Sequence, residues 1–112
     1  MTTDATIENE IQAKGLTAPR IKPDDLEEAI LKWDFHTFPG SMVTVCCLTL
    51  HNGFNVIGES ACVSPENFDA ELGERVAREN AKQKLWPLLG FALKERLFLQ
   101  EPQQHDGAQS LF

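Results

Sequence analysis

The sequence predicts an α+β fold that consists of a helix, a β-hairpin and a long second helix. Residues 42–63 read as two apolar strands around Asn52-Gly53, which is a strong signal for a two-residue type I′ turn. Before and after this segment, apolar residues recur at three- and four-residue spacing, as they do in helices. The chain has 112 residues, enough for one modest core. We therefore expect a single domain over residues 21–100.

The first predicted helix spans about residues 23–35. Pro23 fits the first helical position, where its missing N–H costs nothing. The two aspartates that follow favour the positive end of the helix dipole. One apolar stripe then runs along the helix, formed by Leu26, Ala29, Ile30 and Trp33. The dipeptide Pro39-Gly40 ends the segment.

The predicted hairpin presents two apolar faces. A two-residue turn sets Cys46 opposite Glu59 and places apolar side chains on both sides of the ribbon. Two strands cannot bury two faces by themselves. We expect the second helix to cover one face, so the other face needs a different partner.

The second predicted helix begins at Ser64 and runs to about Leu99. Pro87 must kink or break it, because proline has no N–H and crowds the preceding turn. Its apolar stripe is expected to pack on the hairpin, led by Phe68, Leu72 and Val76. A buried Leu72 predicts that Leu72→Ala costs roughly 2–5 kcal/mol.

Both ends of the chain are predicted to be flexible tails. Residues 1–20 show no sustained apolar period, and residues 101–112 are polar and contain Pro and Gly. No apolar run approaches the roughly 18–20 residues that span a bilayer, and no signal peptide is apparent. We therefore expect a cytosolic protein without membrane contact.

The charge of the chain argues against nucleic-acid binding. The formal net charge is −7, so the chain lacks the excess of basic residues that binding to nucleic-acid phosphates requires. The order helix, strand, strand, helix invites comparison with double-stranded RNA-binding domains, which have a third strand and phosphate-binding lysines at the start of the last helix. Here residues 65–71 carry Glu66, Asp69 and Glu71 instead. The comparison is therefore one of topology only.

The three cysteines are not expected to form a metal or redox site. Cys46 and Cys47 point to opposite faces of a strand. Cys62 shares a face with Cys47, but lies about 13 Å away at about 3.3 Å per residue. That separation is too long for a disulfide. We predict free thiols in a reducing compartment, with no metal and no cofactor.

Glu59 is the most notable candidate for a functional side chain. A carboxylate on an apolar sheet face needs a partner or a raised pKa. Three roles fit it: a structural or interface hydrogen bond, a ligand contact, or acid–base chemistry in a small hydrolase. Because no second carboxylate or histidine is spaced to complete an acid–base pair, we favour a non-enzymatic protein. The candidate partner or ligand contacts are Glu59, His51, Phe54, Trp33 and Trp86.

The uncovered hairpin face predicts a homodimer, since apolar patches and free strand edges invite pairing and a two-fold axis lets one patch meet itself. The candidate interface residues are Val43, Val45, Phe54 and Val56. In the competing arrangement, the segment after Pro87 folds back over this face and completes a monomer.

Five short segments carry a family resemblance: KPD at 22–24, NGF at 52–54, GESACV at 58–63, FD at 68–69 and WPL at 86–88. Together they resemble a family of small tailed-phage proteins that is named after gene products of a coliphage and a Shigella phage. The resemblance covers about residues 21–97. It implies phage origin and expression in the host bacterial cytoplasm, and it supplies no catalytic residue.

These observations lead to one expected function and one alternative. We expect a non-enzymatic phage accessory protein that binds a host or phage protein, in host takeover or counter-defence. The alternative is an oligomeric protein that binds or sequesters a small ligand such as a nucleotide signal.

Overall fold

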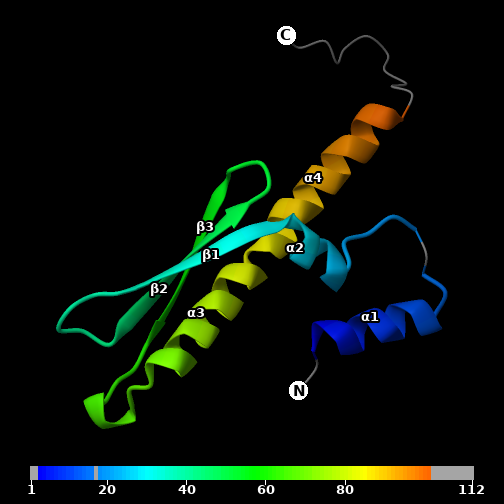
Figure 1. The fold of residues 1–112 in the computed structure, drawn as a ribbon. Helices are drawn as coiled ribbons and strands as arrows, with labels where there is room; N and C mark the ends of the chain where they lie inside the picture. The colour runs from blue at the N-terminus through cyan, green and yellow to red at the C-terminus, as the bar shows by residue number, and fades with distance from the viewer. Residues whose placement is uncertain (1–2, 17, 102–112) are drawn as a thin grey trace.

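The computed structural model describes residues 3–16 and 18–101, which form three strands and several helices around one sheet (Figure 1). The strands form an antiparallel sheet in the order β1-β2-β3, and the α+β class is confirmed. Helix α3 packs against β2 and β3, and α4 continues beyond the sheet. In chain order the elements are α1 (Asp4–Ala13), α2 (Pro23–Ala29), β1 (Ile30–Thr37), β2 (Val43–Leu50), β3 (Asn55–Ala61), the 3-10 turn η1 (Pro65–Asn67), α3 (Ala70–Gln83) and α4 (Leu85–Gln100).

The first predicted helix ends early, and its second half is a strand. Pro23 begins α2 as expected, and the carboxylate of Asp25 accepts a hydrogen bond from the Lys22 backbone N–H at 2.7 Å. From Ile30 onward the chain is extended and pairs with β2. The prediction of helix to residue 35 is therefore wrong. In this stretch Trp33 and Phe35 alternate with polar residues at the strand period, and pairing with β2 satisfies backbone groups that a helix would have bonded internally.

The hairpin turn has three residues instead of two. The Leu50 N–H donates to the Phe54 carbonyl, and the Gly53 N–H donates to the Leu50 carbonyl, each at 2.9 Å. Gly53 has φ +89°, whereas no other residue described in this turn has positive φ. A type I′ turn needs positive φ at both central residues, so Asn52 cannot serve in one here. The turn is instead a three-residue loop with a left-handed glycine at its end.

This turn shifts the strand register by one residue. Cys46 pairs with Gly58, and Glu59 pairs with Val45. Because side chains alternate along a strand, a one-residue shift moves the whole of β3 to the other face. The predicted pairing of Cys46 with Glu59 is therefore wrong, and Val56 lies on the covered face.

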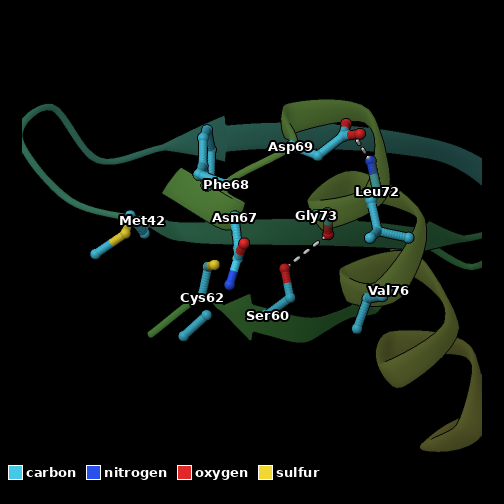
Figure 2. A pocket seen from close by; sticks show the side chains of 10 residues that line it. Met42, Ser60, Cys62, Asn67, Phe68, Asp69, Leu72, Gly73 and Val76 are labelled. Atoms are coloured by element: carbon cyan, nitrogen blue, oxygen red, sulfur yellow. Dashed lines mark hydrogen bonds between the residues drawn. The ribbon is translucent and has the colours of Figure 1, made fainter. Parts of the chain in front are cut away.

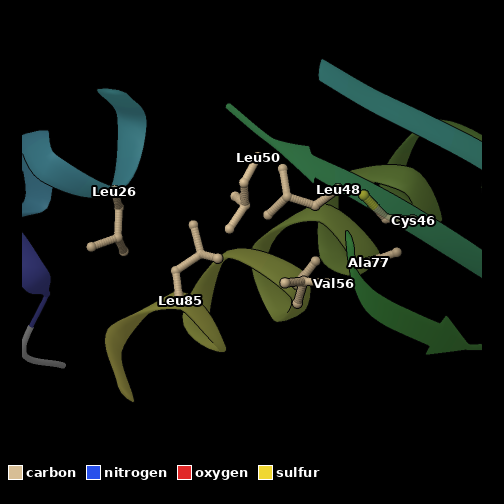
Figure 3. Packing of buried hydrophobic residues seen from close by; sticks show 8 residues of the cluster. Leu26, Cys46, Leu48, Leu50, Val56, Ala77 and Leu85 are labelled. Carbon is tan, nitrogen blue, oxygen red and sulfur yellow. The ribbon is translucent and has the colours of Figure 1, made fainter. Parts of the chain in front are cut away.

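The core lies between the sheet and α3 (Figure 3). Its closest contact is between Gly58 and α3, since a Cβ at Gly58 would lie 2.2 Å from the Ala81 nitrogen and 2.4 Å from the Ala77 oxygen. The missing side chain thus lets the helix backbone approach the strand. The buried apolar residues are Leu26, Cys46, Leu48, Leu50, Val56, Ala77, Ala81 and Leu85.

Helix α3 begins later than predicted and packs through smaller residues. Ser64 precedes only the short η1 turn, and Asp69 caps α3 by accepting from the Leu72 N–H at 3.1 Å. Leu72 and Val76 lie at the side of the helix and are 45% and 41% exposed. The prediction that they lead the packing is wrong, and the burial on which the large predicted cost of Leu72→Ala depends is absent. Because Gly58 has no side chain, α3 lies close to β3, and large side chains do not fit between the helix and the strand.

The second predicted helix is interrupted near Pro87, as expected. Gln83 ends α3, Leu85 begins α4, and Lys84 caps both. Pro87 is the third residue of α4, in the first turn, where a backbone N–H has no intrahelical partner. Helix α4 then runs away from the sheet, so the fold-back that would complete a monomer is not seen in the described residues (Figure 1).

Part of the predicted N-terminal tail is a helix. Thr3 caps α1 by accepting from the Thr6 N–H at 3.1 Å. The helix is held by an ion pair between Glu8 and Arg20, and by a hydrogen bond from Gln83 to Asp4 at 3.1 Å. These polar contacts come from outside the helix, so a search for apolar periodicity does not find them. The predicted C-terminal tail after Glu101 lies outside the described residues.

Candidate partner-binding surface

Glu59 is exposed on the open face of the sheet, which is the face opposite α3. It lies across from Val45, and its backbone carbonyl accepts a hydrogen bond from the Asn80 side chain at 2.8 Å. Its nearest histidine by register is His36, two strands away at roughly 10 Å for a strand spacing of about 4.8 Å. Direct proton transfer needs hydrogen-bond reach, so this geometry sets up no acid–base pair.

The two tryptophans lie at different places in the fold. Trp33 is half-buried on β1, where the Arg78 guanidinium lies 5.5 Å from its ring centroid in a cation–π contact. Trp86 is half-buried at the start of α4 and lines a groove with Ile7 and Ile11 of α1. Both rings therefore have intramolecular packing partners, and they do not meet Glu59 at one site.

His51 and Phe54 flank the β2–β3 turn, and both are exposed. The His51 backbone N–H donates to the Ala29 carbonyl at 3.0 Å, which ties this turn to the end of α2. Val56 is buried beneath α3, so its assignment to an interface is wrong.

The open face of the sheet keeps part of the predicted interface. Val43 and Val45 are half-buried there, together with Cys47, and Ile57 is exposed beside them. Antiparallel sheets commonly have one covered face and one open face. Here the open face carries these apolar side chains together with the charged side chains of Lys32, Asp34 and Glu59.

All three thiols are free, and those of the consecutive residues Cys46 and Cys47 lie on opposite faces of β2. Burial, with a smaller effect from Cys47, raises the pKa of Cys46 to about 11. Cys62 donates a hydrogen bond to the Ser64 carbonyl at 3.1 Å. Within the part of the chain that the structure describes, no group of His, Cys, Asp and Glu side chains is arranged to hold a metal ion.

A shallow groove lies between the end of β3 and the start of α3 (Figure 2). Its polar contacts are internal, since Ser60 donates to the Gly73 carbonyl at 2.7 Å and Asp69 caps the helix. The volume is about 180 Å³, below the range of about 300–1,000 Å³ typical of ligand pockets. Its lining is Met42, Ser60, Ala61, Cys62, Asn67, Phe68, Asp69, Leu72, Gly73 and Val76.

Helix α4 exposes the clearest apolar surface among the described elements. Leu89 and Leu93 face the segment 19–25, while Leu88, Phe91 and Leu99 point elsewhere on the helix and are 39%, 71% and 70% exposed. We call these last three residues the α4 ridge. Soluble helices normally keep one apolar stripe, and helices that are apolar all round are usually buried.

The ridge was not found from the sequence, although a signal was present. Between Leu85 and Gln100 the chain carries only three charged residues, Lys94, Glu95 and Arg96, and its leucines and phenylalanines occur all around the helix. One packed side cannot cover such a helix.

Comparison with known proteins gives the origin of the chain. The family described as "Phage protein (N4 Gp49/phage Sf6 gene 66) family" matches residues 2–97. The chain belongs to this family. The resemblance seen in the sequence is thereby confirmed, and the protein is a bacteriophage protein. No curated protein and no solved structure matches it.

The matched region runs from α1 into α4 and includes two of the three ridge residues, Leu88 and Phe91. The family description names phage origin and no activity, so it does not select among the surfaces described above. In the described residues, no helix has the length and apolar character needed to cross a membrane.

Proposed function

We propose that this phage protein is a non-enzymatic accessory protein that binds a host or phage protein through the α4 ridge. The observation that carries the proposal is the exposure of Leu88, Phe91 and Leu99 on a helix that extends beyond the sheet (Figure 1). Exposed apolar patches mark interaction sites in soluble proteins, and on α4 the exposed Glu95 lies on the same side between Phe91 and Leu99. Residues spaced three and eleven apart lie on one side of a helix, the arrangement that an apolar groove on a partner recognises.

The proposed place of action is the host bacterial cytoplasm, in host takeover or counter-defence. Phage origin supports this setting, and so do three free cysteines, because thiols persist in reducing compartments.

Two other functions have less support. Sequestration of a nucleotide signal would need a phosphate-binding pocket. The β3–α3 groove is lined by one charged residue, Asp69, which repels phosphate. The groove of about 400 Å³ along α4 contains Arg20, Lys22 and Arg96, but Asp25 also lines it and Arg20 is paired with Glu8. A hydrolase built on Glu59 would need an acid–base partner nearer than His36. We therefore propose protein binding in place of either chemistry.

Site-specific photo-crosslinking during infection tests the proposal. A photoreactive phenylalanine analogue replaces Phe91 or Leu99, and replaces Glu79 on the exposed side of α3 in the control. We expect both ridge positions, but not position 79, to capture the same host or phage protein, and Phe91→Lys to abolish capture from position 99.

Two results would contradict this function. Equal capture from position 79 would show that the ridge has no specific partner. Ridge crosslinks that join only two copies of this chain would make α4 a self-association surface.

A further inference from the structure

The two edges of the sheet differ, and the β3 edge is covered. The outward-facing carbonyls of Ile57 and Glu59 accept hydrogen bonds from Lys84 at 2.7 Å and from Asn80 at 2.8 Å. Both donors come from α3 and its junction with α4. Proteins protect exposed strand edges by covering them in this way, so β3 is a poor site for another strand.

The β1 edge is uncovered. Phe38 donates its N–H to the Val43 carbonyl at 3.3 Å, and antiparallel pairing alternates, so even-numbered residues of β1 point their backbone groups at β2. The N–H and C=O groups of Trp33, Phe35 and Thr37 therefore point outward. Among the described residues, none of these groups has a hydrogen-bond partner.

The space beneath the β1 edge is also only partly filled. Helix α3 packs mainly on β2 and β3, and a groove of about 180 Å³ lies between Phe35 and the side chains of Glu71, Glu74, Arg75 and Arg78. Leu31 and Phe35 are 57% and 36% exposed. A strand added at this edge would cover both side chains.

We propose that β1 is a self-association surface, on which β1 of a second copy pairs antiparallel across a two-fold axis at Trp33. The two sheets then join into one across residues 32–34, and Leu31, which lies at a bulge in β1, comes near Phe35 of the other protomer. This surface is separate from the α4 ridge, so the proposal does not depend on the proposed function.

Charge complementarity indicates that the strand that pairs with the β1 edge comes from a second copy of this chain. With Trp33 on the axis, Lys32 of each protomer lies opposite Asp34 of the other, on the open face. These are the non-hydrogen-bonded pairs, whose Cα atoms approach to about 4.5 Å and whose side chains lie closest. In the single chain both side chains are about 60% exposed, and within the described residues their ion pair is with each other at 3.4 Å. Dimerisation would replace the exposed contact within each protomer by two cross-strand ion pairs shared between the protomers.

Pairing about a two-fold axis at Asp34 or Phe35 is less favourable than pairing about Trp33. An axis at Asp34 places two aspartates opposite each other, and like charges directly across a sheet are destabilising. An axis at Phe35 places Asp34 opposite His36 and Lys32 opposite Phe38, so the Lys32–Asp34 pairs are lost. Only axes that keep odd-numbered residues opposite one another can use the free backbone groups.

Sedimentation velocity on the full chain, from low to high micromolar concentration, tests the association. We expect a dimer whose dissociation constant rises about tenfold or more in Asp34→Lys, because both cross-strand pairs become Lys–Lys. The double variant Lys32→Asp/Asp34→Lys restores opposite charges and should restore the dimer. A monomeric wild-type chain, or an Asp34→Lys chain that dimerises like wild type, overturns the proposal. So does loss of the dimer in Phe91→Lys alone.

Mixed-chain crosslinking tests the register. One chain carries Lys32→Cys and the other Asp34→Cys, both in a background of Cys47→Ser and Cys62→Ser. Paired Cα atoms at about 4.5 Å lie within disulfide range, so we expect an oxidised dimer only in the mixture. Self-crosslinking of Asp34→Cys alone overturns the Trp33 axis, and no crosslinking in any sample overturns pairing at β1.

Discussion

Gly58 is the residue on which the contact between sheet and helix depends. Glycine is needed there for space and not for its backbone angle, because its φ is not in the left-handed region. A Cβ at this position would lie 2.2 Å from the nearest helix backbone atom. Backbone cannot rotate away as a side chain can, so α3 would have to move as a whole.

Gly58→Ala is therefore expected to destabilise the fold by about 3 kcal/mol or more, at the upper end of overpacking effects. Gly90→Ala is the matched control, because a Cβ at Gly90 meets nothing within 4 Å. In the interior of α4 that change should stabilise by up to about 1 kcal/mol. Urea unfolding followed by circular dichroism measures both, and equal stability of Gly58→Ala and wild type would contradict the packing.

The adjacent cysteines are expected to differ strongly in reactivity. Burial raises the pKa of Cys46 to about 11, so at pH 8 it is almost entirely the unreactive thiol, and reagent cannot reach it. Cys47, its neighbour on the open face, is half-buried. Timed alkylation with mass spectrometry should modify Cys47 first and Cys46 only on unfolding. Modification of both at one rate would mean that the β2 register is wrong.

At the scale of elements, α1 is attached by charge more than by apolar burial, since none of its residues is fully buried. Hydrogen bonding from Gln12 lowers the pKa of Glu8, and the Arg20 guanidinium adds to the effect. The Gln12 side chain donates to the Glu8 carboxylate at 2.5 Å. A lowered pKa in the folded state means that ionised Glu8 stabilises the docked helix.

The stabilisation from Glu8 is present above its unfolded pKa, near 4.5, and is lost as the pH falls through the lower folded value. We expect amide exchange in α1 to accelerate, relative to the intrinsic rate, as the pH falls below 4.5, while β2 stays protected. Glu8→Gln should reproduce the loss at neutral pH. Glu10→Gln is the control, because the ion pair that Glu10 makes with Lys14 is exposed on both sides. Unchanged protection in Glu8→Gln would show that α1 is held otherwise.

At the scale of the whole molecule, the order helix, three strands, helix repeats that of double-stranded RNA-binding domains, now with the third strand that the sequence had not predicted. The charge of this chain is still opposite in sign to the charge with which those domains hold phosphates. Glu66 in η1 and Glu71 in the first turn of α3 are exposed, and the formal net charge is −7. Shared topology does not carry function.

Purified protein is therefore expected to bind neither RNA nor DNA at physiological salt. A gel shift with duplex RNA and duplex DNA, repeated at low salt, measures this. Binding that weakens as salt rises would indicate phosphate contacts and would contradict the prediction.

Local signals in the sequence determined the start of α2 at Pro23, the hairpin around Asn52-Gly53, the helix boundary near Pro87 and the family. Each depends on a few neighbouring residues and on backbone angles that those residues strongly prefer. Tertiary structure decided the rest. Trp33 fits the apolar stripe of a helix and the alternation of a strand equally well, and only pairing with β2 makes residues 30–37 a strand. The register depends on whether Asn52 takes positive φ. The packed side of α3 depends on Gly58, a residue of another element. The α4 ridge exists because no part of the described chain covers that side of the helix, which no local pattern can reveal.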